Sequence, residues 1–459
     1  MSFKHHDEAR TDAIMALLKW VSDSKEDTKA VLIDDLYGKY RVIIWPGQLP
    51  AKQAEDTVEG LLSPAAGNYW SGQIWVVTPD TSTLDQQVDE SAWTEGRPHP
   101  DEPRLRIVDR VRSKIAWFGD LTEPPWKVGG PGNDKAPPIV VFYSFKGGVG
   151  RTTALASFAI QRARAGERVV VVDGDLDAPG IGPLMSVATP ILAKPGQALS
   201  DDPSDKLALF ELSLPRWGVV DYLLETPSSN DADLSDYYQS VCNEPIVSGG
   251  GEILVFPAGR IDEHYLAKLA RLDFDPARQG AMTPWTQFLD RIRQELKPDW
   301  ILLDSRAGLG EPAGLLLSGM AHLHVLLGTS SEQSWQGIRL ILDRIGSGRV
   351  QRDEPQAECV LVQTMIPEFH EAEKDAKDAF SARAEGEFED HYYAEGENEA
   401  MWCVRDMAAK DAPHRPVYLN YKQSLAHFRT IENVLTDLVG EQYVNLAKRI
   451  QSRFVEDAP

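Results

Sequence analysis

The stretch of sequence that decides the fold covers residues 139–153 and reads IVVFYSFKGGVGRTT. Its first half is an apolar run rich in β-branched and aromatic residues, which predicts a buried strand. Its second half carries Gly147, Gly148 and Gly150, which allow the backbone to take positive φ and to turn its N–H groups toward an anion. The run that follows, as far as Ile160, predicts a helix whose N-terminus adds partial positive charge. Strand, glycine loop and helix together predict a phosphate-binding site.

The loop departs at two places from the usual phosphate-loop pattern G-x-x-x-x-G-K-[ST]. Phe145 stands at the first glycine position, and Arg151 stands where lysine is usual. Lys146 supplies a second cation at the start of the loop, and Thr152 offers a hydroxyl at the position that ligates Mg²⁺ in such loops. A guanidinium is planar and forked, whereas an ammonium is a compact charge, so the exchange at Arg151 is not neutral toward phosphate. A loop that binds nucleotide without hydrolysing it therefore stays open as an alternative.

Two more apolar runs end in acidic residues, as expected of buried parallel strands that carry ligand-binding groups at their carboxyl ends. The first leads to Asp173 and Asp175, and the second leads to Asp304 and the glycine-bearing segment SRAGLG. The plainer alternative is a set of aspartates in surface turns. The buried character of the preceding strands favours a site.

Taken together, these motifs resemble the deviant Walker A loop ATPases of the ParA/MinD family, with an arginine variant at the second basic position. The resemblance covers residues 139–454. It implies an α/β fold, a P-loop NTPase with a mostly parallel, helix-covered sheet, here preceded by a smaller N-terminal α/β domain. It also implies ATP and Mg²⁺ as cofactors and a slow ATPase activity.

By this resemblance, Lys146 reaches across a nucleotide-sandwich dimer to the partner's phosphates, and Asp175 positions the attacking water. Thr152 and Asp304 would hold Mg²⁺, and Gln363 stands where the family has the amide that reads adenine. The loop residues implied to bind nucleotide are Gly147, Gly148, Val149, Gly150, Arg151, Thr152 and Thr153.

The composition of the chain predicts three parts. Residues 1–120 form an N-terminal α/β domain of unknown role, in which 105–118 are expected to be an amphipathic helix with basic residues on a solvated face. Residues 121–138 are a linker rich in proline and glycine. Residues 139–459 form the ATPase-like domain, with a solvated, mobile acidic insertion at about 368–411.

The charge of the chain bears on its partners. A formal net charge of −23 over 459 residues argues against nucleic-acid binding, which depends on lysines and arginines that neutralise phosphates. The sequence has no run of eighteen apolar residues and no signal-peptide core, and its last helix lacks a dense basic face, so we expect no membrane contact. With three widely spaced cysteines and no disulfide pattern, the expected location is cytoplasmic.

These observations lead to one expected function and two alternatives. The expected function is an ATP-binding and hydrolysing switch that forms an ATP-dependent homodimer and controls a protein partner through the N-terminal domain. The first alternative is a nucleotide-sensing, weakly hydrolysing or non-hydrolysing scaffold subunit of a bacterial multi-protein stress or defence system. The second is a DNA-partitioning ATPase, against which the acidic balance argues.

Overall fold

The computed structural model describes residues 4–79, 81–111, 113–118, 123–128, 136–186, 215–226, 232–241, 244–274, 283–352, 354–368, 370–395, 402–426 and 431–454. The chain divides into two compact units, Met1–Ser113 and Lys114–Pro459, and each is described by itself. Within the described residues, no helix is both long enough and apolar enough to cross a membrane.

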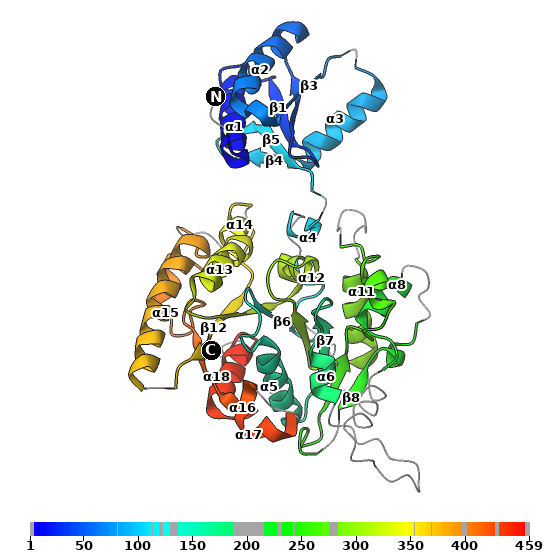
Figure 1. Cartoon of the computed structure of the whole chain (residues 1–459), viewed down its shortest axis with the longest axis vertical. Coiled ribbons are helices and arrows are strands. Elements are labelled where there is room, and N and C mark those ends of the chain that lie inside the picture. Colours follow the sequence, from blue (N-terminus) through cyan, green and yellow to red (C-terminus); the bar gives the residue numbers. More distant parts are fainter. Residues whose placement is uncertain are drawn as a thin grey trace. The chain divides into compact units, whose positions relative to one another are not determined.

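The first unit is a small five-stranded α/β sandwich (Figure 1). Its sheet has the order β3-β2-β1-β5-β4, in which β1 runs antiparallel to β2 and parallel to β5. Helices α1 and α2 cover one face of the sheet, and α3 packs on the other face. The elements are α1 (His6–Ser22), β1 (Lys29–Asp34), β2 (Tyr40–Trp45), α2 (Ala51–Ala66), β3 (Trp70–Val76), α3 (Thr83–Glu95), β4 (Arg97–His99) and β5 (Glu102–Asp109).

The helix expected over residues 105–118 is wrong for its first part, which forms strand β5 instead. The side chains alternate there: Leu105 is buried against the α1–α2 side, while the guanidinium of Arg106 lies 4.4 Å from the Trp93 ring on the other side. The flanking arginines pair with nearby carboxylates, as Arg104 does with Glu102 at 2.7 Å. Over so short a stretch, the two-residue alternation of a strand and the 3.6-residue repeat of a helix fit the same apolar residues, and the prediction took the wrong one.

The second unit contains the larger sheet. Its elements are α4 (Ile115–Phe118), β6 (Ile139–Ser144), α5 (Arg151–Arg164), β7 (Arg168–Gly174), α6 (Ile181–Ser186), α8 (Val219–Glu225), β8 (Gln239–Val241), β9 (Glu252–Phe256), α9 (Tyr265–Leu269), α11 (Pro284–Arg291), β10 (Trp300–Ser305), α12 (Glu311–Leu315), β11 (Leu323–Gly328), α13 (Glu332–Ile345), α14 (Ser347–Val350), β12 (Cys359–Ile366), α15 (His370–His391), β13 (Val417–Asn420), α16 (Gln423–Ala426), α17 (Leu435–Leu438) and α18 (Glu441–Ser452).

Eight strands form this sheet in the order β13-β12-β11-β6-β10-β7-β9-β8, and all pairs are parallel except β8 with β9. Alternate residues of β6 belong to opposite layers. Val141 is part of the apolar core that also contains residues of α8, α11, α12, α13 and α15, and Phe142 is part of the core that contains residues of α5, α6, α17 and α18. Figure 1 shows these two helical layers on either side of the sheet. The expected mostly parallel, helix-covered sheet and the smaller N-terminal unit are both confirmed.

The acidic segment that follows β12 is not a solvated insertion throughout. Residues His370–His391 form the helix α15, which buries Phe380, Ala384 and Phe388 in the core beside α13. The many glutamates hid this apolar stripe, which recurs at a spacing of four residues. Residues 396–401 of the segment lie outside the described residues.

Candidate functional site

The glycine loop connects the end of β6 to the start of α5. Gly148 and Gly150 have φ of +72° and +86°, and a Cβ atom placed on either would meet no atom within 4 Å. Glycine is therefore needed there for its backbone conformation, while the space beside the loop stays open. Phe145, at the loop entrance, packs so closely on Gly337 of α13 that a Cβ there would lie 1.9 Å from the ring. The loop is thus held at its base and open along its glycines.

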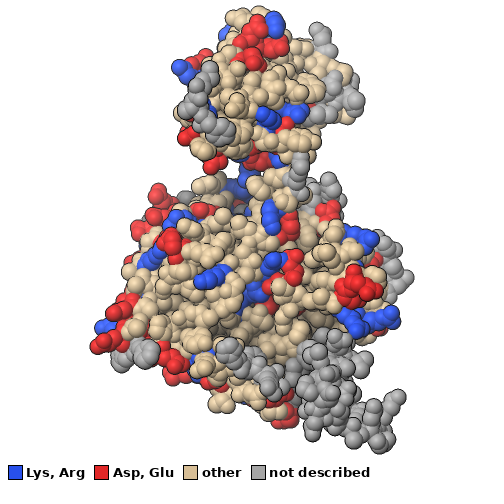
Figure 2. All heavy atoms as spheres, in the orientation of Figure 1, with Lys and Arg blue, Asp and Glu red and all other residues tan. Residues whose placement is uncertain are grey.

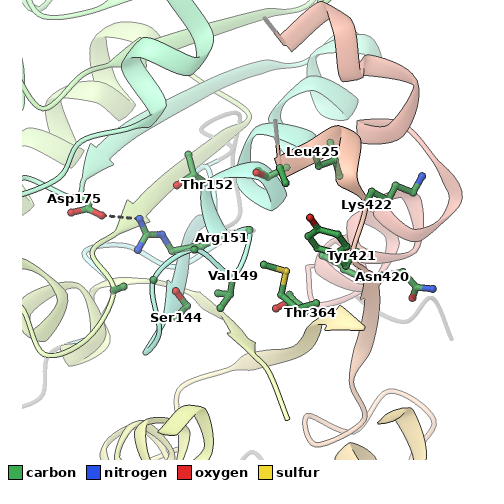
Figure 3. Close-up of a pocket in the computed structure, with 18 of the residues that line it drawn as sticks. Ser144, Val149, Arg151, Thr152, Asp175, Thr364, Asn420, Tyr421, Lys422 and Leu425 are labelled. Carbon is green, nitrogen blue, oxygen red and sulfur yellow. Dashed lines mark hydrogen bonds and ion pairs between the residues drawn. The ribbon is translucent and has the colours of Figure 1, made fainter. Parts of the chain in front are cut away.

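A cavity of about 650 Å³ lies beside the loop (Figure 3). On one side it is lined by the loop and by the beginning of α5, from Gly147 to Thr153. The opposite wall comes from the ends of β12 and β13 and from the helices after them. Its residues there are Thr364, Met365, Leu419, Asn420, Tyr421, Lys422, Leu425, Ala426 and Tyr443. The cavity therefore lies at the carboxyl ends of the parallel strands, where ligands bind in such sheets.

At the bottom of this edge, Arg151 joins the two acidic strand ends. Its Nε donates to Asp304 Oδ1 at 2.7 Å, and a terminal nitrogen donates to Asp175 Oδ2 at 2.9 Å. Thr152 Oγ1 donates to Asp304 Oδ2 at 2.7 Å. Figure 3 shows the Arg151 side chain pointing toward Asp175, with Thr152 beside it. The residues predicted from three separate motifs thus form one cluster.

Burial makes this cluster electrostatically strained. Asp304 is fully buried, and burial raises its pKa, although Arg151 and Thr152 oppose the rise. Burial would lower the pKa of Arg151, but the charges of Asp304 and Asp175 outweigh it and raise that pKa. Asp173 is also fully buried, and its pKa is raised well above the usual value by burial and then by the two neighbouring aspartates. Two carboxylates therefore bind one guanidinium, and a third carboxyl group lies buried close to them.

The segment after β10 forms a loop between the cavity and α12. Arg306 and Ala307 line the cavity, and Arg306 forms an ion pair with Asp177. Gly308, with φ of +72°, is tied to the end of β6, since its N–H donates to Ser144 O at 3.2 Å. This segment, residues 306–310, is called the switch loop below.

The remaining predicted residues fall in different places. Val149 is buried within the loop and Thr153 lines the cavity, whereas Lys146 is exposed. Gln363 does not line the cavity. Its side chain is buried and donates to Ala376 O at 3.0 Å and to Ser330 Oγ at 3.2 Å. Gln363 would have to leave these bonds to reach a base, so its role stays a prediction.

Sequence reasoning missed the opposite wall of the cavity. Tyr421, Lys422 and Leu425 follow β13, and none of them is among the predicted site residues. The usable signal was its parallel direction, because the carboxyl end of every parallel strand lies at the same edge. Nothing in the local sequence marks Tyr443 of α18, which reaches the cavity only through the packing of α18 against β13 and α5.

No protein-family model and no curated protein matches this chain. Similar solved structures include pNOB8 ParA bound to nonspecific DNA, which is 16% identical to this chain. The match covers 69% of this chain and 98% of that chain, with a TM-score of 0.44. A ParA family ATPase from Chlorobium tepidum has 14% identity, with 68% and 99% covered and a TM-score of 0.39. MinD from Pyrococcus horikoshii complexed with Mg-ADP has 18% identity, with 53% and 77% covered and a TM-score of 0.32. At these identities and scores, the case for function rests on the geometry of the site.

The cluster can hold a phosphate chain and a divalent cation. Thr152 and Asp304 present a hydroxyl and a carboxylate, the hard oxygen ligands that Mg²⁺ uses together with substrate phosphates and waters. The loop from Gly147 to Gly150 borders the cavity and has room for an anion along its glycines. The residues present therefore fit Mg²⁺ and a nucleoside triphosphate.

Proposed function

We propose that this chain is an ATP-binding and hydrolysing switch of the ParA/MinD type. The observation that carries the proposal is the contact between Thr152 and Asp304 at 2.7 Å, beside an open glycine loop and a cavity of about 650 Å³. A strand, a glycine loop and a helix start make an anion site, and the adjacent oxygen pair would hold Mg²⁺. Mg²⁺, when bound, supplies charge neutralisation at the phosphates.

Arg151 has a specific part in this proposal. Its guanidinium binds Asp304 through Nε and Asp175 through a terminal nitrogen, so a phosphate at the loop would compete with these two carboxylates for it. We infer that phosphate binding exchanges these partners: Arg151 turns to the anion, Asp304 becomes free for Mg²⁺, and Asp175 becomes free to orient water. An arginine here would thus make access to both carboxylates depend on nucleotide.

The same observation favours the second candidate, a nucleotide-sensing subunit that hydrolyses little or no ATP. If Arg151 keeps its bond to Asp175 when nucleotide is bound, no free carboxylate is left to orient water. On that view ATP sets the shape of the site, and the N-terminal unit docks a protein partner. Phosphate release from purified protein, measured beside ATP affinity by calorimetry, separates the two candidates: tight binding with no release above background supports the sensor.

Lys146 is assigned the role of a cation that acts across an ATP-dependent homodimer. It is exposed, as a residue that reaches a second chain must be. Lys146→Ala is expected to lower phosphate release by about 10³-fold or more, the contribution of such cationic fingers in other phosphoryl-transfer systems. ATP affinity should stay nearly unchanged. Unchanged turnover would contradict the assignment.

Two measurements address assembly and partners. Sizing the protein with ADP and with a non-hydrolysable ATP analogue tests the dimer, which should form only with the analogue. Retention on duplex DNA at low and high salt tests the DNA-partitioning alternative. The net charge of −23 argues against retention, and on the face drawn in Figure 2 the lysines and arginines are interspersed with aspartates and glutamates. We therefore expect no retention that is sensitive to salt.

A further inference from the structure

The short helix α4 holds the far end of the switch loop. The indole of Trp117 lies against Gly314 of α12, where an added Cβ would come within 2.7 Å of the ring. Its Nε1 donates to the carbonyl of Gly310, the last residue of the switch loop, at 2.8 Å. Figure 1 shows α4 beside α12. Only glycine at 314 lets the ring approach closely enough to make this bond.

Charged groups hold α4 at both of its ends. The carboxylate of Glu311 accepts the backbone N–H groups of Lys114 and Ala116, the latter at 3.4 Å. Arg344 of α13 donates to the carbonyls of Ala116 and Trp117 at 2.9 and 2.5 Å. The position of α4 is therefore fixed by α12 and α13 and not by a single contact.

The switch loop connects this anchor with the cavity. At its other end, Arg306 and Ala307 line the cavity, and the carbonyl of Gly308 accepts the hydroxyl of Tyr143 from β6 at 3.1 Å. Only a few residues separate Arg306 from Gly310, so a movement of Arg306 is expected to reach Gly310. Loops of this kind change position with the phosphate they contact.

We propose that Trp117 is a positioning residue for the switch loop and that it transmits the loop's position to the segment that leads to the N-terminal unit. That segment begins at Lys114, directly after Ser113, the last residue of the first unit. The inference rests on the proposed nucleotide binding. In this proposal α4 acts as a relay, because a change at the cavity alters the bond between Gly310 and Trp117, and with it the stability of α4.

The test uses the full chain and hydrogen exchange measured by mass spectrometry, with and without Mg²⁺ and a non-hydrolysable ATP analogue. In the wild type we expect nucleotide to protect residues 147–153 and to change the exchange of residues 114–118 by about fivefold, the size of one hydrogen bond. Trp117→Phe keeps an aromatic ring against Gly314 and removes the N–H donor. In this variant the protection at 147–153 should remain, and the response at 114–118 should be lost.

A matched control and a kinetic readout complete the test. Trp75→Phe makes the same chemical change at an exposed tryptophan of β3 in the first unit and should behave as wild type. Trp117→Phe should also lower the rate of phosphate release by about fivefold while leaving ATP affinity within about twofold, because the lost bond positions the loop and does not touch the nucleotide.

Three outcomes would overturn the inference. Protection of 147–153 without any response at 114–118 in the wild type would show that nucleotide binds and that α4 does not sense it. A response at 114–118 that survives in Trp117→Phe would show that the indole N–H is not the relay. Absence of protection at 147–153 would remove the proposed nucleotide site, and the relay with it.

Discussion

Two arginines, Arg10 in the first unit and Arg151 in the second, make the same kind of bridge in different surroundings. Each comes from a helix and joins aspartates at the carboxyl ends of two neighbouring parallel strands. In the first unit Arg10 lies 3.1 Å from Asp34 of β1 and 2.6 Å from Asp109 of β5. The bridge of Arg151 repeats this arrangement at the ends of β7 and β10.

The two bridges differ in burial and in the backbone beside them. The side chains of the first are 14–31% exposed, and those of the second are 0–10% exposed. A glycine loop precedes α5, whereas the sequence before α1 contains no glycine. In both sheets, therefore, an arginine between two aspartates closes the ends of two parallel strands. Deep burial beside a glycine loop that borders a cavity is what turns such a closure into a candidate ligand site.

The largest expected effect comes from removing each arginine. Arg151→Met leaves buried carboxylates without a counter-charge and should lower the free energy of unfolding of the second unit by about 3–5 kcal/mol. Arg10→Met, the matched change in the more exposed bridge, should cost the first unit about 1 kcal/mol. Native-state hydrogen exchange of amides in β10 and β1 measures each unit by itself. Equal losses would show that burial does not distinguish the bridges.

A smaller effect is expected on the pH dependence of stability, and it comes from Asp173, the third carboxyl group beside the second bridge. Burial raises the pKa of Asp173 above its unfolded value, so its stabilising contribution is present at low pH and is lost as pH rises through the folded pKa. Asp173→Asn cannot ionise. Relative to wild type, this variant should gain stability as pH rises above about 4, the pKa of an aspartate in the unfolded chain. Exchange of the β7 amides over a pH series checks this, and a difference independent of pH would contradict it.

The smallest expected effect separates backbone strain from ligand binding. Gly148 in the loop and Gly72 in β3 share a φ of +72°, and a Cβ atom on either would meet no atom within 4 Å. Replacing either by alanine should cost about 1 kcal/mol of stability, because an L-residue is strained there. Only Gly148→Ala should also weaken ATP binding, measured by calorimetry. If both variants bind ATP as wild type does, the loop amides do not contact the phosphates.

How much could be predicted from the sequence depends on how far apart the contacting residues are along the chain. The strand, glycine loop and helix around Gly148 were predictable because one short segment contains the whole motif. Asp175 and Asp304 were predictable because each ends an apolar run and parallel strands share an edge. That Arg151 bridges both was not, since phosphate-loop patterns give this position to phosphate and say nothing of its partners.

Other features needed the assembled structure. Strand β5 was predicted as a helix because its apolar residues fit both periods over a short length, and only pairing with β1 decides between them. The apolar stripe of α15 is hidden among glutamates. The contact of Trp117 with Gly310 joins residues almost two hundred positions apart, with no local pattern to announce it.

The far wall of the cavity has a consequence for how this protein is made. Residues such as Tyr421 and Tyr443 are translated long after Gly147, yet they enclose the same space. A nascent chain that has released its glycine loop from the ribosome still lacks the residues of the far wall. Closure of the cavity on this side must therefore wait until α18 has emerged and docked, long after the glycine loop has been translated.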